Sequence, residues 1–171
     1  ISLHESGQYL FPGTGFVREK GSGVGEGYAV NIPFYPHTDD DVYLWAFNEV
    51  VPPLIRGFAP DVLVTQLGID SYHSDPLTHL NLTSRGYIQA VQAFGGMGIP
   101  WLAFGGGGYD LSAVARCWSL AYGVMLGTEW PNAIPDEYSK EYGVTELRDT
   151  VALEIPEDVQ RDARALAEEA V

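Results

Sequence analysis

The sequence has little cysteine and few basic residues for its length. One cysteine, Cys117, occurs in 171 residues, so the chain can build neither an internal disulfide nor a thiolate metal site. Lys and Arg number 9 against 23 Asp and Glu, giving a formal net charge of −14. Nucleic acid and anionic membranes bind basic surfaces, so this charge argues against both as partners. Cys117 lies in an apolar segment, where we expect a buried, unreactive thiol.

Long apolar runs are absent as well, and no segment approaches the length of a transmembrane helix. No basic-then-apolar leader opens the chain, so we expect a cytoplasmic protein. The first residue is Ile1 rather than Met, and the residues after it resemble the end of a strand, so we expect a processed or partial chain. A hydrophobic content of 46% over this length is enough for one domain with a core.

The most informative segment combines two apolar runs with a helical pattern between them. Residues 62–68 and 99–104 read as strands, and residues 83–94 read as a helix. A strand, a helix and a second strand predict a parallel pair with a crossover, which is typical of an α/β fold. Because parallel strands end at the same edge of a sheet, we expect Asp70 and Tyr109 to share that edge.

The rest of the chain adds further predicted elements around this unit. Residues 21–27 are glycine-rich, but they lack the Gly-Lys-Ser/Thr ending of a phosphate-binding loop and are expected to form a surface loop. Asp39–Asp41 favour a helix start, and Pro52 and Pro53 should kink or divide that helix. The other predictions are strands over residues 28–34 and 150–155, helices over residues 42–56 and 157–170, and a helix over residues 111–126 that is apolar on nearly every side and should be buried.

Two polar side chains at the strand ends could carry chemistry. Asp70 could be a metal ligand, a general base or a structural, hydrogen-bonded carboxylate. His73 and His79 could complete a carboxylate–histidine site with it, although two exposed loop histidines are the favoured interpretation. Tyr109 follows four glycines, and its hydroxyl could donate a hydrogen bond to an oxyanion or simply pack at a helix start.

Several short motifs occur in a fixed order along the chain. They are Phe11-Pro12-Gly13-Thr14-Gly15, Tyr28-Ala29-Val30-Asn31-Ile32-Pro33, Gln66-Leu67-Gly68-Ile69-Asp70-Ser71, Asp75-Pro76-Leu77, Asn81-Leu82-Thr83, Gly105-Gly106-Gly107-Gly108-Tyr109 and Ala115-Arg116-Cys117-Trp118. In order and spacing they resemble the C-terminal half of the zinc-dependent histone deacetylase family, most closely its bacterial acetoin utilisation branch. The resemblance covers residues 1 to about 130 of what we treat as a single partial domain over residues 1–171, with a C-terminal excursion and helix over residues 131–171.

The resemblance implies the three-layer α/β/α arginase-deacetylase fold with a parallel sheet, of which this chain would be the C-terminal portion. It implies that Asp70 is one zinc ligand and that Tyr109 polarises the acyl carbonyl. The implied substrate is an acetylated lysine, an acetylated polyamine or a small amide. The remaining implied positions are Leu77 and Gly107 along the acyl tunnel, and Ser2, Leu3 and Tyr28 at sites for a monovalent cation, potassium or sodium.

The resemblance also implies that part of the site lies outside this sequence. The family's other zinc ligands and its pair of general-base histidines precede the position of Ile1. We therefore expect the chain alone to be inactive, and to need either the N-terminal half or self-association. A non-catalytic acyl-binding module with the same fold, and a different metal enzyme built on Asp70, His73 and His79, are the two alternatives.

Overall fold

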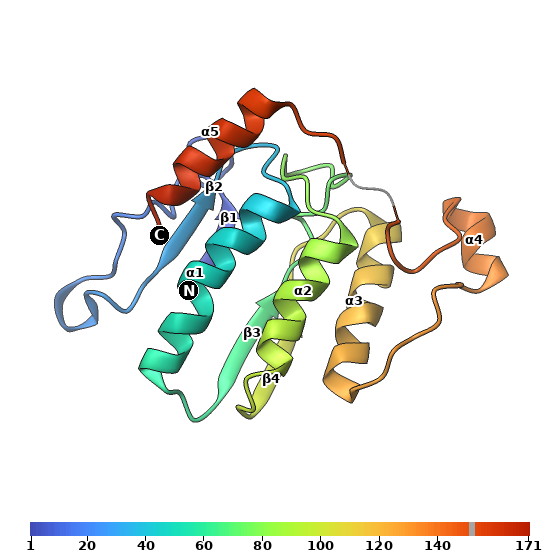
Figure 1. Ribbon diagram of the computed structural model, residues 1–171, viewed down its shortest axis with the longest axis horizontal. Helices are drawn as coiled ribbons and strands as arrows, with labels where there is room; N and C mark the ends of the chain where they lie inside the picture. The colour runs from blue at the N-terminus through green and yellow to red at the C-terminus, as the bar shows by residue number, and fades with distance from the viewer. Residues whose placement is uncertain (151–152) are drawn as a thin grey trace.

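Four parallel strands and five α-helices build the structure, a computed structural model that describes residues 1–150 and 153–171. Two two-stranded parallel sheets are formed, one by β1 and β2 and the other by β3 and β4. The arrows of β2 and β3 point toward the same end of the molecule (Figure 1). The strands are β1 (Ser2–Glu5), β2 (Asn31–Phe34), β3 (Leu63–Leu67) and β4 (Trp101–Gly105).

The helices lie mainly between and after these strands. The predicted crossover is confirmed, because α2 connects the parallel strands β3 and β4. The glycine-rich segment carries only a short 3-10 turn, Gly23–Gly25, that is mostly exposed. The helices are α1 (Asp40–Phe58), α2 (Ser84–Gly95), α3 (Leu111–Leu126), α4 (Asp136–Tyr142) and α5 (Glu157–Glu168).

Helix α1 is continuous over Asp40–Phe58, so of the two predicted effects of Pro52 and Pro53, a kink or a division, the division does not occur. The Asp39 carboxylate accepts a hydrogen bond from the Val42 backbone N–H and caps the helix, as expected. Pro52 and Pro53 lie inside it. The helix continues because its buried face extends past both prolines, and Ile55 beyond them lies in the same core cluster as Val51 before them. Tertiary packing therefore outweighs the local cost of the prolines.

Helix α3 has the predicted bounds but not the predicted burial. One side packs in a core with α2, β3 and β4, where Cys117 is completely buried, and burial raises the pKa of this thiol to about 12. The opposite side is exposed and carries large apolar residues, including Tyr122 and Leu126. The expectation of a helix buried on all sides is wrong, because the described residues provide a partner for one side only. The predicted strand over residues 150–155 falls partly on residues 151–152, which lie outside the described part, and its other residues form no strand.

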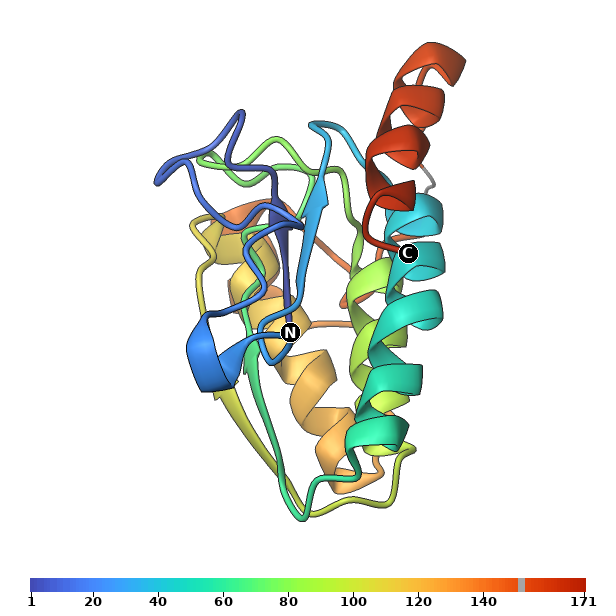
Figure 2. The same ribbon diagram turned by 90° about the vertical axis from the view of Figure 1, so that its left-hand side faces the viewer.

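The sheet of β3 and β4 is covered on one face. Trp101 and Ala103 pack toward α2 and α3, whereas Val64, Leu102 and Phe104 alternate with the covered residues and are each at least half exposed. Figure 2 shows β3 and β4 at one side of the molecule, with α1 and α5 at the other. Parallel sheets are normally covered on both faces, so this apolar face is unusual for an exposed surface.

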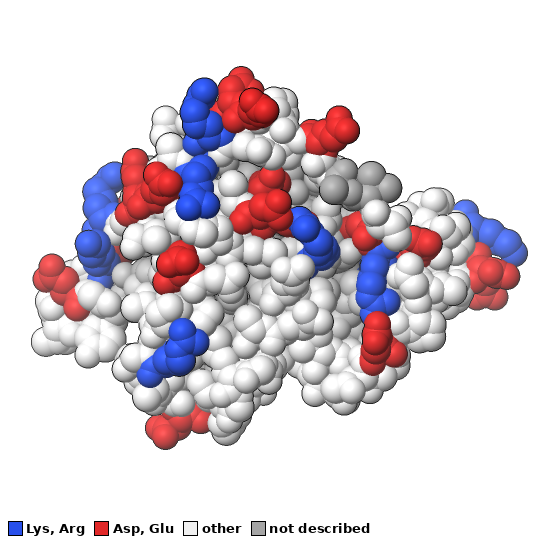
Figure 3. Space-filling model, in the orientation of Figure 1, with Lys and Arg blue, Asp and Glu red and all other residues white. Residues whose placement is uncertain are grey.

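Charged residues lie mainly over the helices. On the face shown in Figure 3, acidic and basic side chains are intermixed over α1 and α5. No helix in the described part of the chain is both long enough and apolar enough to span a membrane.

The start of α2 is fixed to α1 by one buried carboxylate. Asp40 accepts hydrogen bonds from the Thr83 backbone N–H at 2.8 Å, the Thr83 hydroxyl at 2.6 Å and the Arg85 Nε at 3.1 Å. Gly86 leaves room for it, since a Cβ there would lie 2.1 Å from an Asp40 carboxylate oxygen. The two helices are therefore locked together at the end nearest the loop that follows β3.

Replacing this carboxylate should destabilise the protein. We expect Asp40→Ala to lower the free energy of unfolding by about 2–3 kcal/mol, because several charge-assisted hydrogen bonds are lost in a buried position. Asp41 is the matched control: it also binds Arg85, but its side chain is 79% exposed. Asp41→Ala should change stability by less than about 0.5 kcal/mol. Urea denaturation of both variants checks this, and equal losses would contradict it.

Candidate active site

The carboxyl ends of β3 and β4 meet in one tightly packed edge. Beyond the strands, the Ile69 backbone N–H donates a hydrogen bond to the Gly107 carbonyl at 2.6 Å. The two chains approach so closely that a Cβ on Gly106 would lie 2.7 Å from the Gly68 Cα. Only glycine fits such a position, so the glycine run serves to bring two backbones together. The structure thus places Asp70 and Tyr109 on one edge, as the topology predicts.

Asp70 sits against the glycine run. A Cβ on Gly107 would lie 2.0 Å from an Asp70 carboxylate oxygen, so this glycine leaves the space that the carboxylate occupies. The Thr78 hydroxyl donates a hydrogen bond to the Asp70 carbonyl and holds the backbone. Burial raises the pKa of Asp70, and the nearby carboxylate of Asp75 raises it further. Both effects disfavour the ionised form of Asp70, and a positive charge beside it would oppose them.

Asp75 organises the loop between β3 and α2. One of its carboxylate oxygens accepts the Tyr109 backbone N–H at 2.8 Å, and the other accepts the Leu77 N–H at 2.9 Å. A single buried side chain therefore fixes two of the predicted site positions. This role of Asp75 is not among the predicted ones. The sequence signal for it is an acidic residue directly before Pro76, a common arrangement at turns.

The Tyr109 side chain is exposed to solvent, although its backbone is fixed by Asp75. It is 54% exposed and follows Gly108, whose φ of 148° is one that side-chain-bearing residues rarely adopt. Leu77 is similarly exposed, at 52%. Both side chains can meet a ligand from solvent without any movement of the backbone.

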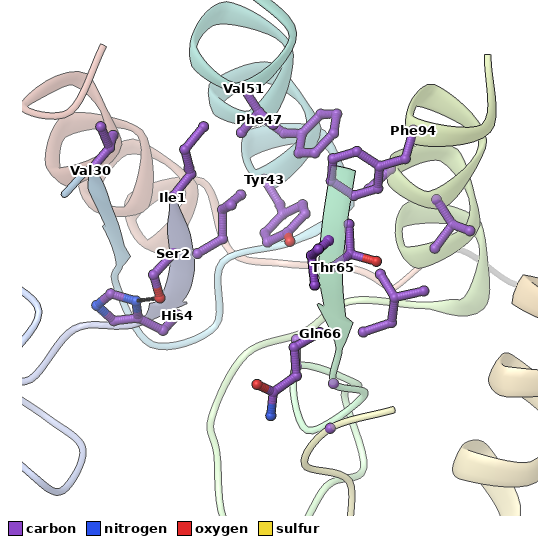
Figure 4. A pocket seen from close by; sticks show the side chains of 18 of the residues that line it. Ile1, Ser2, His4, Val30, Tyr43, Phe47, Val51, Thr65, Gln66 and Phe94 are labelled. Atoms are coloured by element: carbon purple, nitrogen blue, oxygen red, sulfur yellow. Dashed lines mark hydrogen bonds between the residues drawn. The ribbon is translucent and has the colours of Figure 1, made fainter. Parts of the chain in front are cut away.

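The predicted cation positions lie round a hollow that also reaches Asp70. A cavity of about 860 Å³ is lined by Ser2, Leu3, Tyr28, Asp70 and Gly107, among others, whereas Leu77 and Tyr109 are not part of its lining. The Ser2 hydroxyl hydrogen-bonds His4 Nδ1 at 2.8 Å (Figure 4). His4 Nε2 also hydrogen-bonds the Gly15 carbonyl at 2.9 Å. The structure thus brings five of the seven predicted site positions together round one space, and places the other two on the edge beside it.

The alternative metal site is not formed. Among residues 1–150 and 153–171, no three His, Cys, Asp or Glu side chains are grouped so as to hold a metal ion. His79 Nδ1 lies 3.0 Å from a carboxylate oxygen of Glu5, and the His73 ring stacks on Tyr72 with centroids 4.4 Å apart. Both histidines are exposed, as the favoured interpretation expects. The separate metal enzyme built on Asp70, His73 and His79 has no support in this geometry.

A buried polar network on α3 and Asp149 also holds the loop between β3 and α2, and it is not among the predicted site residues. Arg116 in α3 donates to the Tyr72 hydroxyl at 2.8 Å and to an Asp149 carboxylate oxygen at 3.0 Å. Tyr72 donates to the same Asp149 oxygen at 2.8 Å, and Ser84 at the start of α2 donates its backbone N–H to the other oxygen. An arginine inside an otherwise apolar helix was the available signal, because a buried charge needs a partner.

Comparisons with known proteins agree with this geometry. The histone deacetylase domain family matches residues 1–125. The acetoin utilization protein AcuC of Bacillus subtilis is 42% identical over 147 residues, which is 81% of this chain and 37% of that protein. Histone deacetylase 8 of Danio rerio is 40% identical over 144 residues, 84% of this chain and 38% of that protein.

Solved structures give the same result. The crystal structure of an HDAC homolog complexed with SAHA superposes with a TM-score of 0.84 at 29% identity, covering 99% of this chain and 49% of that one. An HDAC homolog from Aquifex aeolicus gives the same TM-score at 28% identity, again over 49% of its own chain. The α/β fold with a parallel sheet is therefore the fold of this group. The chain spans about two fifths of these curated relatives and half of the solved homologues.

A methyl group at Gly107 should disturb Asp70 directly. We expect Gly107→Ala to lower the free energy of unfolding by about 1–3 kcal/mol, because the new Cβ must displace a carboxylate or a backbone. Gly57 in α1 is the control, since a Cβ there meets no atom within 4 Å. Gly57→Ala should be neutral or stabilise by up to about 1 kcal/mol. Thermal unfolding compares the two, and a harmless Gly107→Ala would contradict the close contact.

The network behind the loop should make stability depend on acid pH. Burial opposes the ionisation of Asp149, but the Ser84 N–H, Arg116 and Tyr72 outweigh it and lower its pKa. A lowered folded-state pKa contributes stability above the unfolded value, about 3.9, which is lost as the pH falls through the folded value.

We therefore expect Asp149→Asn to lower the free energy of unfolding by about 3 kcal/mol at pH 7, because it leaves the Arg116 charge buried without its carboxylate. The difference from the unaltered protein should shrink as the pH falls below about 4. Urea denaturation across pH 3–7 measures this. A difference that is constant across that range would show that the charge of Asp149 is not what stabilises the loop.

Proposed function

The chain belongs to the histone deacetylase family, and from this membership we propose that it supplies one part of a zinc-dependent deacetylase site that hydrolyses an acetyl-lysine-type amide. The observation that carries the proposal is the edge where β3 and β4 end. There Asp70 and Tyr109 occupy adjoining strand ends, held together by the hydrogen bond between Ile69 and Gly107. The two groups differ in chemistry, one an anionic oxygen ligand and the other a neutral hydrogen-bond donor.

Tyr109 is the proposed catalytic residue. Its hydroxyl would donate a hydrogen bond to the oxygen of the acyl carbonyl as negative charge develops there. The Asp75 carboxylate would keep the Tyr109 backbone in place through its 2.8 Å hydrogen bond. Rotation of the Tyr109 side chain would then need no movement of the backbone. Leu77 and Gly107 would line the path of the acyl chain, one as an exposed apolar side chain and the other as a surface without a side chain.

The residues of this chain do not by themselves fit a zinc ion. Asp70 offers one carboxylate, whereas a catalytic zinc takes three protein ligands, and the described residues form no group of three. Zinc binding would therefore require ligands from the part of the family domain that this chain does not span. Ser2 and Leu3 are proposed to help hold a potassium or sodium ion next to the zinc site, through a hydroxyl and a carbonyl oxygen, and Tyr28 to give a carbonyl oxygen to a second, outer cation site. All three residues line the cavity that reaches Asp70.

The chain alone is proposed to be inactive and to act with the missing N-terminal half or in a homo-oligomer. The exposed apolar face of β3 and β4 supports association, because surfaces of this kind are usually buried against a partner. The proposed substrate is an acetylated lysine, an acetylated polyamine or a small amide. The net charge of −14 would favour cationic molecules at long range.

Activity assays test the proposal with and without a partner. The purified chain with zinc should not turn over an acetyl-lysine reporter, whereas co-expression with the part of the B. subtilis AcuC protein that it does not match should give activity. In that complex Tyr109→Phe should lower kcat by about 10²–10³-fold, because the oxyanion loses its donor. Tyr122→Phe is the control: Tyr122 is 55% exposed, as Tyr109 is, but it lies on α3 away from the edge.

Two outcomes would decide against the proposal. Robust turnover by the chain alone would show that its own residues suffice for catalysis. A complex that binds acyl ligands without hydrolysing them would favour the alternative, a non-catalytic acyl-binding module with the deacetylase fold.

A further inference from the structure

The chain that follows α3 turns back along this helix. Residues 128–149 are termed the return segment; the histone deacetylase domain match ends before it, at residue 125. The return segment leaves the end of α3, passes through α4 and comes back to the start of α3 (Figure 1). Trp130 Nε1 donates to the Ser119 carbonyl at 2.8 Å, and the Tyr138 hydroxyl donates to the Ser112 carbonyl at 3.1 Å. The return segment is therefore attached to α3 at two separate places.

The end of the return segment meets the arginine of α3. Arg116 is 6% exposed, and its Nη1 donates to an Asp149 carboxylate oxygen at 3.0 Å and to the Leu147 carbonyl at 3.4 Å. Among the residues that the structure describes, Asp149 makes the only ion pair with Arg116. A buried guanidinium needs such a partner, because the loss of its hydration is costly. The return segment thus supplies the negative charge that Arg116 requires.

Asp149 also joins the two ends of the loop between β3 and α2. One carboxylate oxygen accepts the Tyr72 hydroxyl at 2.8 Å, near the start of the loop. The other accepts the Ser84 backbone N–H at 2.8 Å, where α2 begins, and the Ser84 hydroxyl accepts the Asp149 N–H at 2.8 Å in return. Both Tyr72 and Ser84 are buried. An acid from a distant segment therefore fixes both ends of this loop.

Tyr72 is connected to the site positions by short backbone hydrogen bonds. Its N–H donates to the Ile69 carbonyl at 3.1 Å, and Asp70 lies inside the turn that this bond closes. Its carbonyl accepts the Asp75 N–H at 2.8 Å, and the Asp75 carboxylate accepts the Tyr109 N–H. A displacement of Tyr72 would therefore reach Asp70 and Tyr109 through one or two hydrogen bonds.

We propose that Asp149 is a positioning residue of the proposed active site. Through Arg116 and Tyr72 it sets the conformation of residues 69–75, and thereby the placement of Asp70 and the Tyr109 backbone. The inference rests on the proposed function, since it concerns how that site is held. It extends the site beyond the matched family domain, into a segment for which the sequence predicts no site residue.

The alternative role for this network is to stabilise the core without acting on the site. The two roles have different consequences for local opening. Loss of a core interaction lowers the stability of the whole protein, and it leaves the local opening of a distant loop unchanged. Loss of a positioning interaction opens the loop itself, because the loop then lacks the bonds that close it. Amide exchange within the loop therefore separates the two.

Hydrogen exchange of the full chain is the first test. In Asp149→Asn, the amides of residues 69–77 and of Tyr109 should exchange at least about tenfold faster than in the unaltered chain. Val50→Ala is the matched control, since Val50 is buried in the core cluster around α1, whereas Tyr72 belongs to the other cluster. It should speed exchange at the same amides by less than about threefold. Equal acceleration in the two variants, or none at the loop, would overturn the proposal.

Tyr72→Phe decides the question should Asp149→Asn fail to fold. It removes one hydroxyl from the network and leaves the ion pair between Arg116 and Asp149 in place. The amides of residues 69–77 should exchange at least about threefold faster than in the unaltered chain, because the loop loses its bond to Asp149. Unchanged exchange there would contradict the path from Asp149 through Tyr72.

The Tyr109 ring gives a readout that a loss of stability alone would not change. With ¹³C-labelled tyrosine, its ring resonance is the one that Tyr109→Phe removes. Asp149→Asn should shift this resonance, because the backbone that carries the ring moves, whereas Val50→Ala should leave it in place. Identical Tyr109 resonances in Asp149→Asn and the unaltered chain would show that the carboxylate does not position this residue.

Activity separates the failure of this proposal from that of the function. In the complex with the unmatched part of B. subtilis AcuC, Asp149→Asn should lower kcat by about tenfold and change KM by less than about twofold, because misplaced groups weaken the chemical step. An active complex whose kcat Asp149→Asn leaves unchanged would overturn the positioning role and leave the function standing. An inactive complex, with exchange and resonances as expected, would refute the function and leave the positioning role standing.

Discussion

The close approach of two backbones beyond β3 and β4 is the constraint on which the site depends. The hydrogen bond from Ile69 to Gly107 extends the parallel ladder past the last strand residues, and the glycines allow it. Any larger residue at Gly106 or Gly107 would push the backbone of Gly68 or the carboxylate of Asp70 out of place. The glycine run is therefore required by packing. Tyr109 comes directly after this run, at the edge of the sheet, where its side chain is exposed.

Two acidic side chains then convert this close approach into a fixed loop. Asp75 accepts backbone N–H groups on both sides of the edge, and Asp149 accepts hydrogen bonds from Tyr72 and Arg116 behind it. Asp75 thus holds backbone N–H groups and Asp149 holds mainly side chains, whereas the Asp70 carboxylate lies against Gly107, and Asp70 lines the cavity. Asp75 and Asp149 are therefore occupied in holding the loop, whereas the Asp70 carboxylate is not needed for that role.

Local patterns in the sequence predicted the elements, and long-range packing decided the rest. The apolar runs and the glycine punctuation were enough for β3, α2, β4 and the bounds of α3, because those signals lie within each segment. The Arg116–Asp149 pair joins residues 33 apart in the chain. The cavity lined by β1 and β3 depends on how the two sheets pack together, which no pattern within one segment predicts. The exposed side of α3 shows the same limit, because an apolar face is buried only where a partner covers it.

The Asp70 carboxylate and the Tyr109 backbone are held at this edge by two different interactions. Gly107 leaves the space that the Asp70 carboxylate occupies, whereas Asp75 accepts the hydrogen bond of the Tyr109 N–H. A change at Gly107 therefore acts first on Asp70, through packing. A change at Asp75 acts first on the backbone of Tyr109 and Leu77, through lost hydrogen bonds.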